Sequence, residues 1–310
     1  MSNFTISVII PCFNEEGNVL VLADKLICVL EKYEDYELLF IDDGSTDKTL
    51  QYIKELAVKD HKIKYISFSR NFGHQKALKA GFDHAVGDCV ISMDGDLQHP
   101  VELIDQMIQK WREGFEVIYT IREDSPKLPI SKRLTSSIFY KFINKISNTT
   151  IPKGAADFRL LDRVVVDVLK DINENFLFIR GIISWVGFKQ YSIRYAANDR
   201  FSGKAKYSRK KMFLFALNGI TSFSIKPLHI ATLLGLIISL VSFCYGFYAI
   251  IMKLLTNRTI PGWSSVLVSV LFLGGLQLLV LGILGEYVGK LFIESKKRPN
   301  YIIKEKNCKS

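Results

Sequence analysis

Two aspartates separated by a single glycine form the pattern in this chain that is best suited to chemistry. Asp94-Gly95-Asp96 directly follows the apolar run 89–93, so both carboxylates would lie on a tight turn at the end of a buried strand. Carboxylate oxygens are hard ligands that suit Mg²⁺ or Mn²⁺, and such a cation can also bind the oxygens of a diphosphate. The turn therefore indicates a site for one of these metals, although an Asp-x-Asp pattern alone is also consistent with a loop of solvated acids.

A second acidic stretch ends another expected strand. Asp42 and Asp43 follow the apolar run 36–41 and precede Ser45. One interpretation is that Asp42 or Asp43 accepts hydrogen bonds from the base or ribose of a nucleotide. Another is that these residues form the turn and the cap of the next helix, and both interpretations can hold at once. The polar residues Asn14, Glu15 and Glu16, which follow the first strand, would lie at the same sheet edge.

The segments that must position these residues alternate between strand and helix patterns. Strands are expected at 5–11, 36–41, 63–68, 89–93 and 115–120, and helices at 18–33, 46–59, 74–84 and 100–113. This alternation predicts a mostly parallel, Rossmann-like α/β sheet with helices on both faces. Ligands of such sheets bind outside the carboxyl ends of the strands, which is where Asp42 and Asp94 stand.

Two long uncharged stretches near the C-terminus predict a membrane hairpin. Residues 227–252 and 259–285 contain no Asp, Glu, Lys or Arg. Each stretch exceeds the roughly 20 apolar residues that cross a hydrocarbon core. We place two transmembrane helices at about 228–252 and 263–286, within the segment 227–288. The alternative, two buried core helices of a soluble protein, is disfavoured by this length and lack of charge.

The net charge of +10 is concentrated on both sides of this hairpin. Basic residues gather in a juxtamembrane linker, 201–226, and in a C-terminal tail, 289–310, while the loop between the spans has only Lys253 and Arg258. Because Lys and Arg accumulate on the cytoplasmic side of membranes, we expect both termini and the N-terminal domain, 1–200, in the cytoplasm. The chain would be a multi-pass protein of the inner (plasma) membrane. Anionic lipid headgroups are then the expected partner of these charges, and nucleic acid is not.

One further segment has a pattern that suits a membrane surface. The stretch 132–146 is amphipathic, with apolar residues on one side and Lys or Arg elsewhere. Such a pattern is typical of a helix that lies in the membrane interface. It is equally consistent with a surface helix that packs on the sheet.

The cysteines and the N-terminus show no sign of secretion. The five cysteines form no C-x-x-C pair, which argues against a zinc site or a disulfide framework. The N-terminus lacks the basic and apolar regions of a signal peptide, so the first half is expected to stay in the reducing cytoplasm.

Five motifs occur in an order that resembles a known enzyme family. They are VIIPCFNEEGNV, IDDGSTDKT, SFSRNFGHQKAL, MDGDLQHP and GAADFRLL. Together they resemble the family 2 glycosyltransferases, which have the GT-A fold. With two C-terminal spans, the whole chain most resembles the polyprenyl-phosphate glycosyltransferases. These include dolichol-phosphate mannose synthase and the bacterial bactoprenol (undecaprenyl-phosphate) glucosyltransferases.

The resemblance implies roles for individual residues. The nucleotide pocket would be lined by Pro11, Phe13, Asn14, Glu15, Asp42 and Asp94. The metal, Mg²⁺ or Mn²⁺, would be bound by Asp94, Asp96 and Gln98. The phosphates of donor or acceptor would be held by Arg122, Arg133, Arg200 and Lys204. Asp157 falls where the family places a catalytic acid that faces the acceptor.

The acceptor implied by the resemblance changes the role expected of Asp157. A phosphate monoester has a second pKa near 6 and is already an anionic nucleophile at neutral pH. Asp157 could therefore act as a base or could position the acceptor or an arginine. Bringing two anions together is the larger problem, because unit like charges at 4 Å repel by roughly 4 kcal/mol at an effective dielectric constant of 20.

The reaction implied by the resemblance is an inverting hexosyl transfer. Glucose would pass from UDP-glucose to undecaprenyl phosphate on the cytoplasmic face, for modification of a cell-surface polysaccharide such as O-antigen. The alternatives are the same reaction with GDP-mannose, UDP-N-acetylglucosamine or an amino sugar, or a non-catalytic membrane scaffold. A processive polysaccharide synthase is disfavoured because the chain has no Q-x-x-R-W motif. Resemblance to the bacterial members also makes a homo-oligomer, such as a tetramer, plausible.

Overall fold

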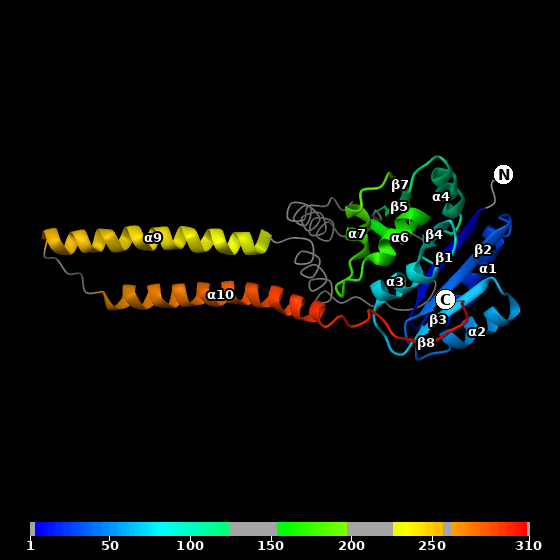
Figure 1. Ribbon diagram of the computed structural model, residues 1–310, viewed down its shortest axis with the longest axis horizontal. Helices are drawn as coiled ribbons and strands as arrows, with labels where there is room; N and C mark the ends of the chain where they lie inside the picture. The colour runs from blue at the N-terminus through cyan, green and yellow to red at the C-terminus, as the bar shows by residue number, and fades with distance from the viewer. Residues whose placement is uncertain (1–3, 124–153, 197–225, 257–261, 309–310) are drawn as a thin grey trace. The chain divides into compact units, whose positions relative to one another are not determined.

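A computed structural model describes residues 4–123, 154–196, 226–256 and 262–308. The chain divides into two compact units. One unit contains Met1–Gly219 together with Arg298–Ser310, and the other contains Ile220–Lys297. The first unit is an α/β domain to which both ends of the chain contribute, and the second is a pair of long helices (Figure 1).

The α/β unit contains an eight-stranded mixed sheet in the order β7-β5-β6-β4-β1-β2-β3-β8. Its strands are β1 (Thr5–Cys12), β2 (Asp35–Asp42), β3 (Ile63–Phe68), β4 (Cys89–Ser92), β5 (Val117–Arg122), β6 (Ala155–Asp162), β7 (Gln190–Tyr195) and β8 (Ile303–Lys306). The four strands β1 to β4 pair in parallel, and β5 pairs in parallel with β7. Only β6 and β8 among the described strands run against their neighbours.

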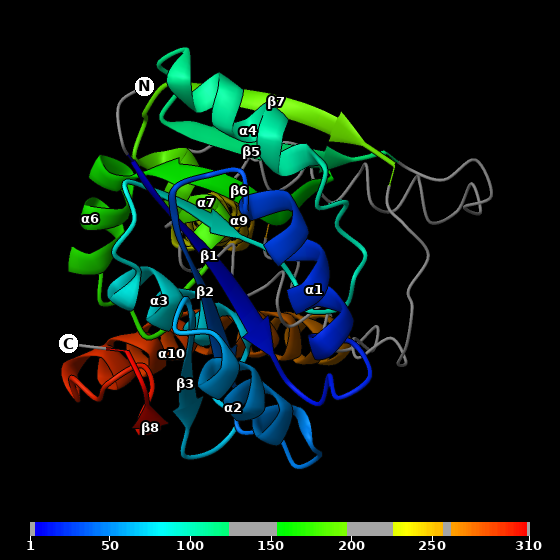
Figure 2. The same ribbon diagram turned by 90° about the vertical axis from the view of Figure 1, so that its right-hand side faces the viewer.

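Helices cover both faces of this sheet (Figure 2). They are α1 (Val19–Leu30), α2 (Thr49–Lys59), α3 (His74–His84), α4 (Leu103–Arg112), α6 (Arg163–Asp171) and α7 (Ile179–Trp185). Apolar residues of α1, α2 and α4 pack with Ile6, Val8 and Phe40 in one core. On the opposite face, Gly81 of α3 lies so close to β1 that an added Cβ would meet the Ile9 side chain at 2.1 Å. The central strands are buried on both faces, which explains why they are continuous apolar runs.

The structure confirms the α/β class and the mostly parallel sheet expected from the sequence. The strand expected at 63–68 and the helix expected at 74–84 have the observed bounds, and the other described elements differ by a few residues at their ends. The helix expected at 132–146 lies outside the described residues. The sequence had predicted no element in the region that forms β6, α6, α7 and β7. There the antiparallel strand β6 is inserted between β4 and β5.

The C-terminal tail returns to the α/β unit as β8, at the edge of the sheet. It pairs antiparallel with β3, and the backbone N–H of Ser69 donates to the carbonyl of Ile302 at 3.0 Å. The Tyr301 ring stacks on Phe68, with ring centroids 5.1 Å apart. The Tyr301 hydroxyl donates to Asp83 of α3 at 2.8 Å. Basic residues of the tail therefore belong to a segment that is built into the domain.

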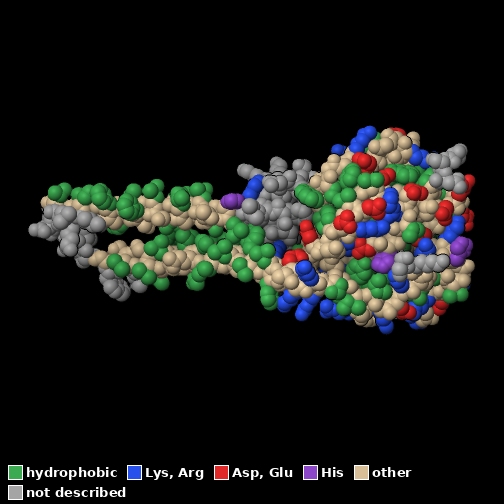
Figure 3. Space-filling model, in the orientation of Figure 1, with side chains coloured by type: hydrophobic (Ala, Val, Ile, Leu, Met, Phe, Trp, Pro, Cys, Tyr) green, Lys and Arg blue, Asp and Glu red, His purple; other side chains and the backbone are tan. Residues whose placement is uncertain are grey.

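The second unit consists of α9 (Lys226–Thr256) and α10 (Trp263–Ser295). Within these helices, Leu228–Tyr248 and Val268–Ser295 are long and apolar enough to cross a membrane, with mean hydropathies of 2.1 and 2.3. Their described apolar side chains are mostly exposed along the helices, as Figure 3 shows. A core helix of a soluble protein would bury such side chains, so these helices need an apolar surrounding from outside the chain.

We predict that replacing Asn307 weakens the folded state of the α/β unit. The Asn307 side chain accepts a hydrogen bond from the Tyr65 N–H at 2.6 Å and donates to the Ile63 carbonyl at 3.3 Å. Asn307→Ala should lower the free energy of unfolding by about 1–2 kcal/mol, because two hydrogen bonds to β3 are lost. Denaturant unfolding measures this, with Lys304→Ala, an exposed side chain of β8, as the control. Equal stability of both variants would contradict a structural role of the tail.

Candidate active site

Three strand ends bring the predicted polar residues to one edge of the sheet. β1 and β2 are parallel neighbours whose last residues, Cys12 and Asp42, are paired in register. β4 lies on the other side of β1 and also runs parallel to it, and Asp94 follows its end by two residues. The carboxyl ends of parallel strands meet at one edge, so the motifs around Asp42 and Asp94 are neighbours across β1.

The loops that follow β1 and β2 are joined by hydrogen bonds. The side-chain oxygen of Asn14 accepts from the Thr46 N–H at 2.8 Å, and the Asn14 N–H donates to the Ser45 hydroxyl at 3.0 Å. Asn14 has a φ of 53°, a left-handed conformation that asparagine tolerates better than most residues. The Glu15 N–H donates to the Thr49 hydroxyl at 2.8 Å. The predicted nucleotide-binding residues of the first loop are thus held against the second loop.

Asp42 and Asp43 have different roles in this architecture. Asp42 is buried, accepting from the Ser67 hydroxyl at 2.8 Å and from the Ser45 N–H at 3.1 Å. Asp43 accepts from the backbone N–H groups of Phe72 and Gly73, at 2.6 Å and 2.9 Å. Asp43 therefore ties down the segment after β3. Asp42 ends β2 beside Cys12, the residue from which the first loop begins.

The acidic turn after β4 is packed closely against the end of β1. A Cβ at Gly95 would lie 3.2 Å from both the Cys12 sulfur and the Pro11 carbonyl oxygen. Leu97 has a φ of 62°, which is unusual for a bulky residue, and it is held in place by burial in the core. The turn also brings His99 close to Asp94, and the Nδ1 of His99 accepts a hydrogen bond from the Asp94 N–H at 3.1 Å. Burial lowers the pKa of His99, which agrees with an unprotonated, accepting Nδ1.

The carboxylates of this turn suit a divalent cation that also binds a substrate. Asp94 Oδ1 is buried and accepts no hydrogen bond from any residue that the structure describes. Asp96 Oδ1 accepts from the backbone N–H of Gln98 at 3.2 Å. The described residues contain no group of three or more His, Cys, Asp or Glu side chains placed to hold a metal. Mg²⁺ is usually bound by one or two carboxylates together with waters and phosphate oxygens, so Asp94 and Asp96 fit that kind of site.

Asp157 lies beside Asp94 because β6 pairs antiparallel with β4. Ser92 is opposite Arg159 in this pairing, and the Ser92 hydroxyl donates to the Asp157 carbonyl at 2.7 Å. His74, the first residue of α3, stands between the two acids. Its Nε2 is 3.4 Å from Asp94 Oδ1 and 3.4 Å from Asp157 Oδ2. Burial lowers the pKa of His74, but the two carboxylates outweigh burial and raise the pKa above its ordinary value.

Two arginines complete the surroundings of Asp157. Arg180 of α7 donates from Nε to Oδ1 at 2.7 Å and from Nη2 to Oδ2 at 2.8 Å. Arg159 Nη2 lies 3.5 Å from Asp157 Oδ1 and donates to the Ala156 carbonyl at 2.8 Å. Burial alone would raise the pKa of Asp157, but Arg180, His74 and Arg159 hold it well below its usual range. Asp157 is therefore an ionised carboxylate within a group of cations.

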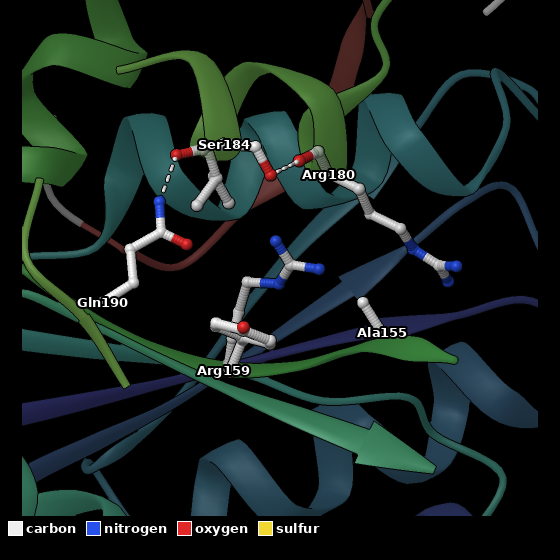
Figure 4. Close-up of a pocket in the computed structure, with 7 residues that line it drawn as sticks. Ala155, Arg159, Arg180, Ser184 and Gln190 are labelled. Atoms are coloured by element: carbon white, nitrogen blue, oxygen red, sulfur yellow. Dashed lines mark hydrogen bonds between the residues drawn. The ribbon is translucent and has the colours of Figure 1, made fainter. Parts of the chain in front are cut away.

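A small pocket lies between this group and α7 (Figure 4). It is lined by Tyr119, Ala155, Arg159, Arg180, Ile183, Ser184 and Gln190. Arg159 rises from β6 toward α7, whereas the guanidinium of Arg180 extends on the side of Ala155 (Figure 4). The Ser184 hydroxyl donates to the Arg180 carbonyl, and Gln190 donates to the Ile183 carbonyl. Arginines thus provide the charged surface of the pocket.

The remaining predicted site residues are only partly described. Arg122 is the exposed last residue of β5, whose neighbour in the sheet is β6. Arg133, Arg200 and Lys204 lie outside the described residues. The structure thus brings together Asp94, Asp96 and Asp157 but does not place most of the predicted phosphate-binding cations.

Sequence reasoning missed three residues of this site. They are His74, Arg159 and Arg180. Arg159 is two residues from Asp157, so recognising 155–162 as a strand would have placed both side chains on one face. Arg180 had no such signal, since it reaches Asp157 from a helix far along the chain.

Comparisons with known proteins agree on one family. Residues 7–169 match the family model "Glycosyl transferase family 2". The bactoprenol glucosyl transferase of Shigella phage SfV is 44% identical over 306 residues, covering 98% of this chain and 99% of that protein. The prophage bactoprenol glucosyl transferase homolog of Escherichia coli K12 is 44% identical over 301 residues, covering 96% and 98%.

Solved structures with a similar arrangement are much more distant in sequence. One is the Mycobacterium tuberculosis glucosyl-3-phosphoglycerate synthase in complex with Mn²⁺, UDP and glucosyl-3-phosphoglycerate. It is 17% identical, with a TM-score of 0.45, and the match covers 70% of this chain and 78% of that one.

We predict that Gly44 is required to join the loops of the candidate nucleotide pocket. Gly44 has a φ of 69°, and an added Cβ would lie 2.5 Å from the Arg70 carbonyl carbon. Gly114 has a φ of 88° with nothing within 4 Å of such a Cβ, so it is a matched control. Both alanine variants should lose about 1–2 kcal/mol for the left-handed backbone, and Gly44→Ala should lose more. Unfolding midpoints and UDP affinity measure this, and equal effects of the two variants would contradict the close packing.

Proposed function

The chain belongs to glycosyl transferase family 2, and from this premise we propose that it transfers glucose from UDP-glucose to undecaprenyl phosphate. The proposal rests on one observation: the same chain has an acidic sheet edge and two long, exposed apolar helices. The edge suits a soluble sugar nucleotide, and the helices suit a membrane in which a lipid acceptor resides. The relatives named bactoprenol glucosyl transferase, 44% identical over nearly the full length, support this donor and acceptor.

The GT-A fold of the α/β unit provides the donor side of the proposed reaction. We assign the loops around Asn14 and Asp42 to the nucleoside of UDP-glucose, since they are joined to each other and lie at the carboxyl ends of β1 and β2. Asp94 and Asp96 would hold Mg²⁺ or Mn²⁺ against the diphosphate. When bound, the metal would offset the charge that develops on the departing UDP.

We assign the acceptor side of the reaction to Asp157 and the cations around it, His74, Arg159 and Arg180. His74 links Asp94 with Asp157, so the proposed diphosphate and acceptor positions adjoin. Arginine is well suited to an acceptor phosphate because its planar fork matches two phosphate oxygens. We assign Arg122, Arg133, Arg200 and Lys204 to phosphate binding as well, on the strength of the family resemblance.

The topology of the chain supports a cytoplasmic position for both termini. The segments before α9 and after α10 contribute strands to one sheet, so the chain must cross a membrane an even number of times between them. The concentration of Lys and Arg on both sides of the helix pair then favours the cytoplasmic side for the α/β unit. We propose that the protein is anchored in the inner membrane with this unit in the cytoplasm, and that it forms homo-oligomers.

The proposed reaction is tested with membranes that contain the protein, undecaprenyl phosphate, Mg²⁺ or Mn²⁺, and labelled sugar nucleotides. Label from UDP-glucose should enter the lipid fraction. Asp94→Asn should lower this transfer by about 100-fold or more, because Asp94 would hold the cation that offsets the charge on the departing UDP. Asp24→Asn, at an exposed position of α1, should leave transfer unchanged. If only GDP-mannose or UDP-N-acetylglucosamine gave labelled lipid, its sugar would replace glucose in the proposed reaction. Full activity of Asp94→Asn would refute the assignment of Asp94 to the metal.

The proposed orientation is tested by labelling cysteines with a membrane-impermeant maleimide. Cys28 is exposed on α1 and should be labelled only after cells are broken open. A cysteine introduced between the spans, Asn257→Cys in a Cys28→Ser background, should be labelled in intact cells. The reverse pattern would place the α/β unit outside the cell and would exclude UDP-glucose as the donor.

A further inference from the structure

The two oxygens of the Asp157 carboxylate are already engaged within the protein. Arg180 binds both of them through Nε and Nη2, at 2.7 Å and 2.8 Å. Arg159 and His74 approach the same oxygens at 3.5 Å and 3.4 Å. The Asp157 side chain is only 5% exposed. A general base needs an accessible oxygen with an affinity for protons near the working pH, and this carboxylate has neither property.

Arg180 is the more exposed of the two arginines around Asp157. Its side chain is 30% exposed, whereas those of Arg159 and Asp157 are 4% and 5% exposed. Asp157 binds the Nε–Nη2 edge of the guanidinium, so the edge that includes Nη1 is directed away from Asp157. A guanidinium carries five N–H donors, enough to bind a carboxylate and a phosphate on different edges. Of the two arginines, Arg180 is therefore the one exposed enough to reach a ligand.

The position of Arg180 relative to the acidic turn suits an acceptor phosphate. Asp157 separates Arg180 from His74, and His74 in turn contacts Asp94. A phosphate bound by Arg180 would thus lie near the diphosphate proposed for Asp94. The pair of ions also limits the charge of the site, because Asp157 offsets Arg180 until an anion arrives.

We propose that Asp157 is a positioning residue that holds Arg180, and that Arg180 binds the phosphate of the acceptor lipid. This assignment rests on the proposed function, because it takes the acceptor to be a phosphate monoester. Its oxygen attacks the anomeric carbon of UDP-glucose, the new carbon–oxygen bond forms, and the bond to the β-phosphate breaks. UDP leaves with the electron pair. The dianionic acceptor carries no proton on the attacking group, so no base is required.

A double-mutant cycle distinguishes this role from that of a base. The four full-length proteins are the wild type, Asp157→Asn, Arg180→Gln and the double variant, assayed with UDP-glucose and undecaprenyl phosphate. Each single variant should raise the acceptor KM by about tenfold or more, the effect of losing a charged hydrogen bond, with little change in donor KM. The double variant should be no worse than Arg180→Gln, because Asp157 acts through Arg180. Arg180→Lys should fall between the wild type and Arg180→Gln.

A base would give a different result in the same cycle. Asp157→Asn would then lower kcat by about 100-fold or more in both backgrounds and leave the acceptor KM unchanged. That result would overturn the proposal, as would an unchanged acceptor KM in Arg180→Gln. Arg112→Gln, at an exposed position of α4, is the control for loss of an arginine. If Asp157→Asn fails to fold, Arg180→Lys and Arg180→Gln decide the question.

Direct binding separates this proposal from the proposed reaction. The detergent-solubilised wild type should bind undecaprenyl phosphate but not undecaprenol in the absence of any sugar nucleotide, and Arg180→Gln should bind about tenfold more weakly. Equal binding by the wild type and Arg180→Gln would overturn the role of Arg180 alone. If the wild type bound neither lipid, undecaprenyl phosphate would not be the acceptor, and both the proposed reaction and the proposed role of Arg180 would be wrong.

Discussion

The antiparallel pairing of β6 with β4 is the constraint on which the candidate site depends. The register that sets Ser92 opposite Arg159 also carries Asp157 to the edge where Asp94 follows β4. A shift of one residue would turn Asp157 and Arg159 to the other face of the sheet, where Phe158 and Leu160 pack in the core. The antiparallel strand β6 is therefore needed for the site, because it carries Asp157 and Arg159.

Electrostatics explains why cations surround this reversed strand. Asp94, just beyond the end of β4, and Asp157, on the adjacent strand β6, are neighbouring acids, and His74, Arg159 and Arg180 offset them. The same cations would serve a reaction between two anions, since both the sugar nucleotide and a lipid phosphate carry negative charge. A site of this kind performs its chemistry mainly by positioning and by charge stabilisation.

The C-terminal tail, which follows α10, contacts the rest of the α/β unit at two places. β8 pairs with β3, and β3 carries Ser67, whose hydroxyl binds Asp42. Tyr301 of the tail also binds Asp83 of α3, the helix that begins at His74. The chain after α10 is thus linked through hydrogen bonds to β3, which contacts Asp42, and to α3, which begins at His74.

The sequence by itself determined the features that depend on local pattern. Alternating apolar runs predicted β1 to β5 and their helices, acids at strand ends predicted the edge of Asp42 and Asp94, and uncharged length predicted α9 and α10. Only the tertiary structure decided that His74, Arg159 and Arg180 meet at Asp157 and that residues 303–306 join the sheet. Except for Arg159, which is two residues from Asp157 on β6, these contacts join residues far apart in the chain. They depend on strand order and register, which arise from packing of the whole sheet and leave no local pattern in the sequence.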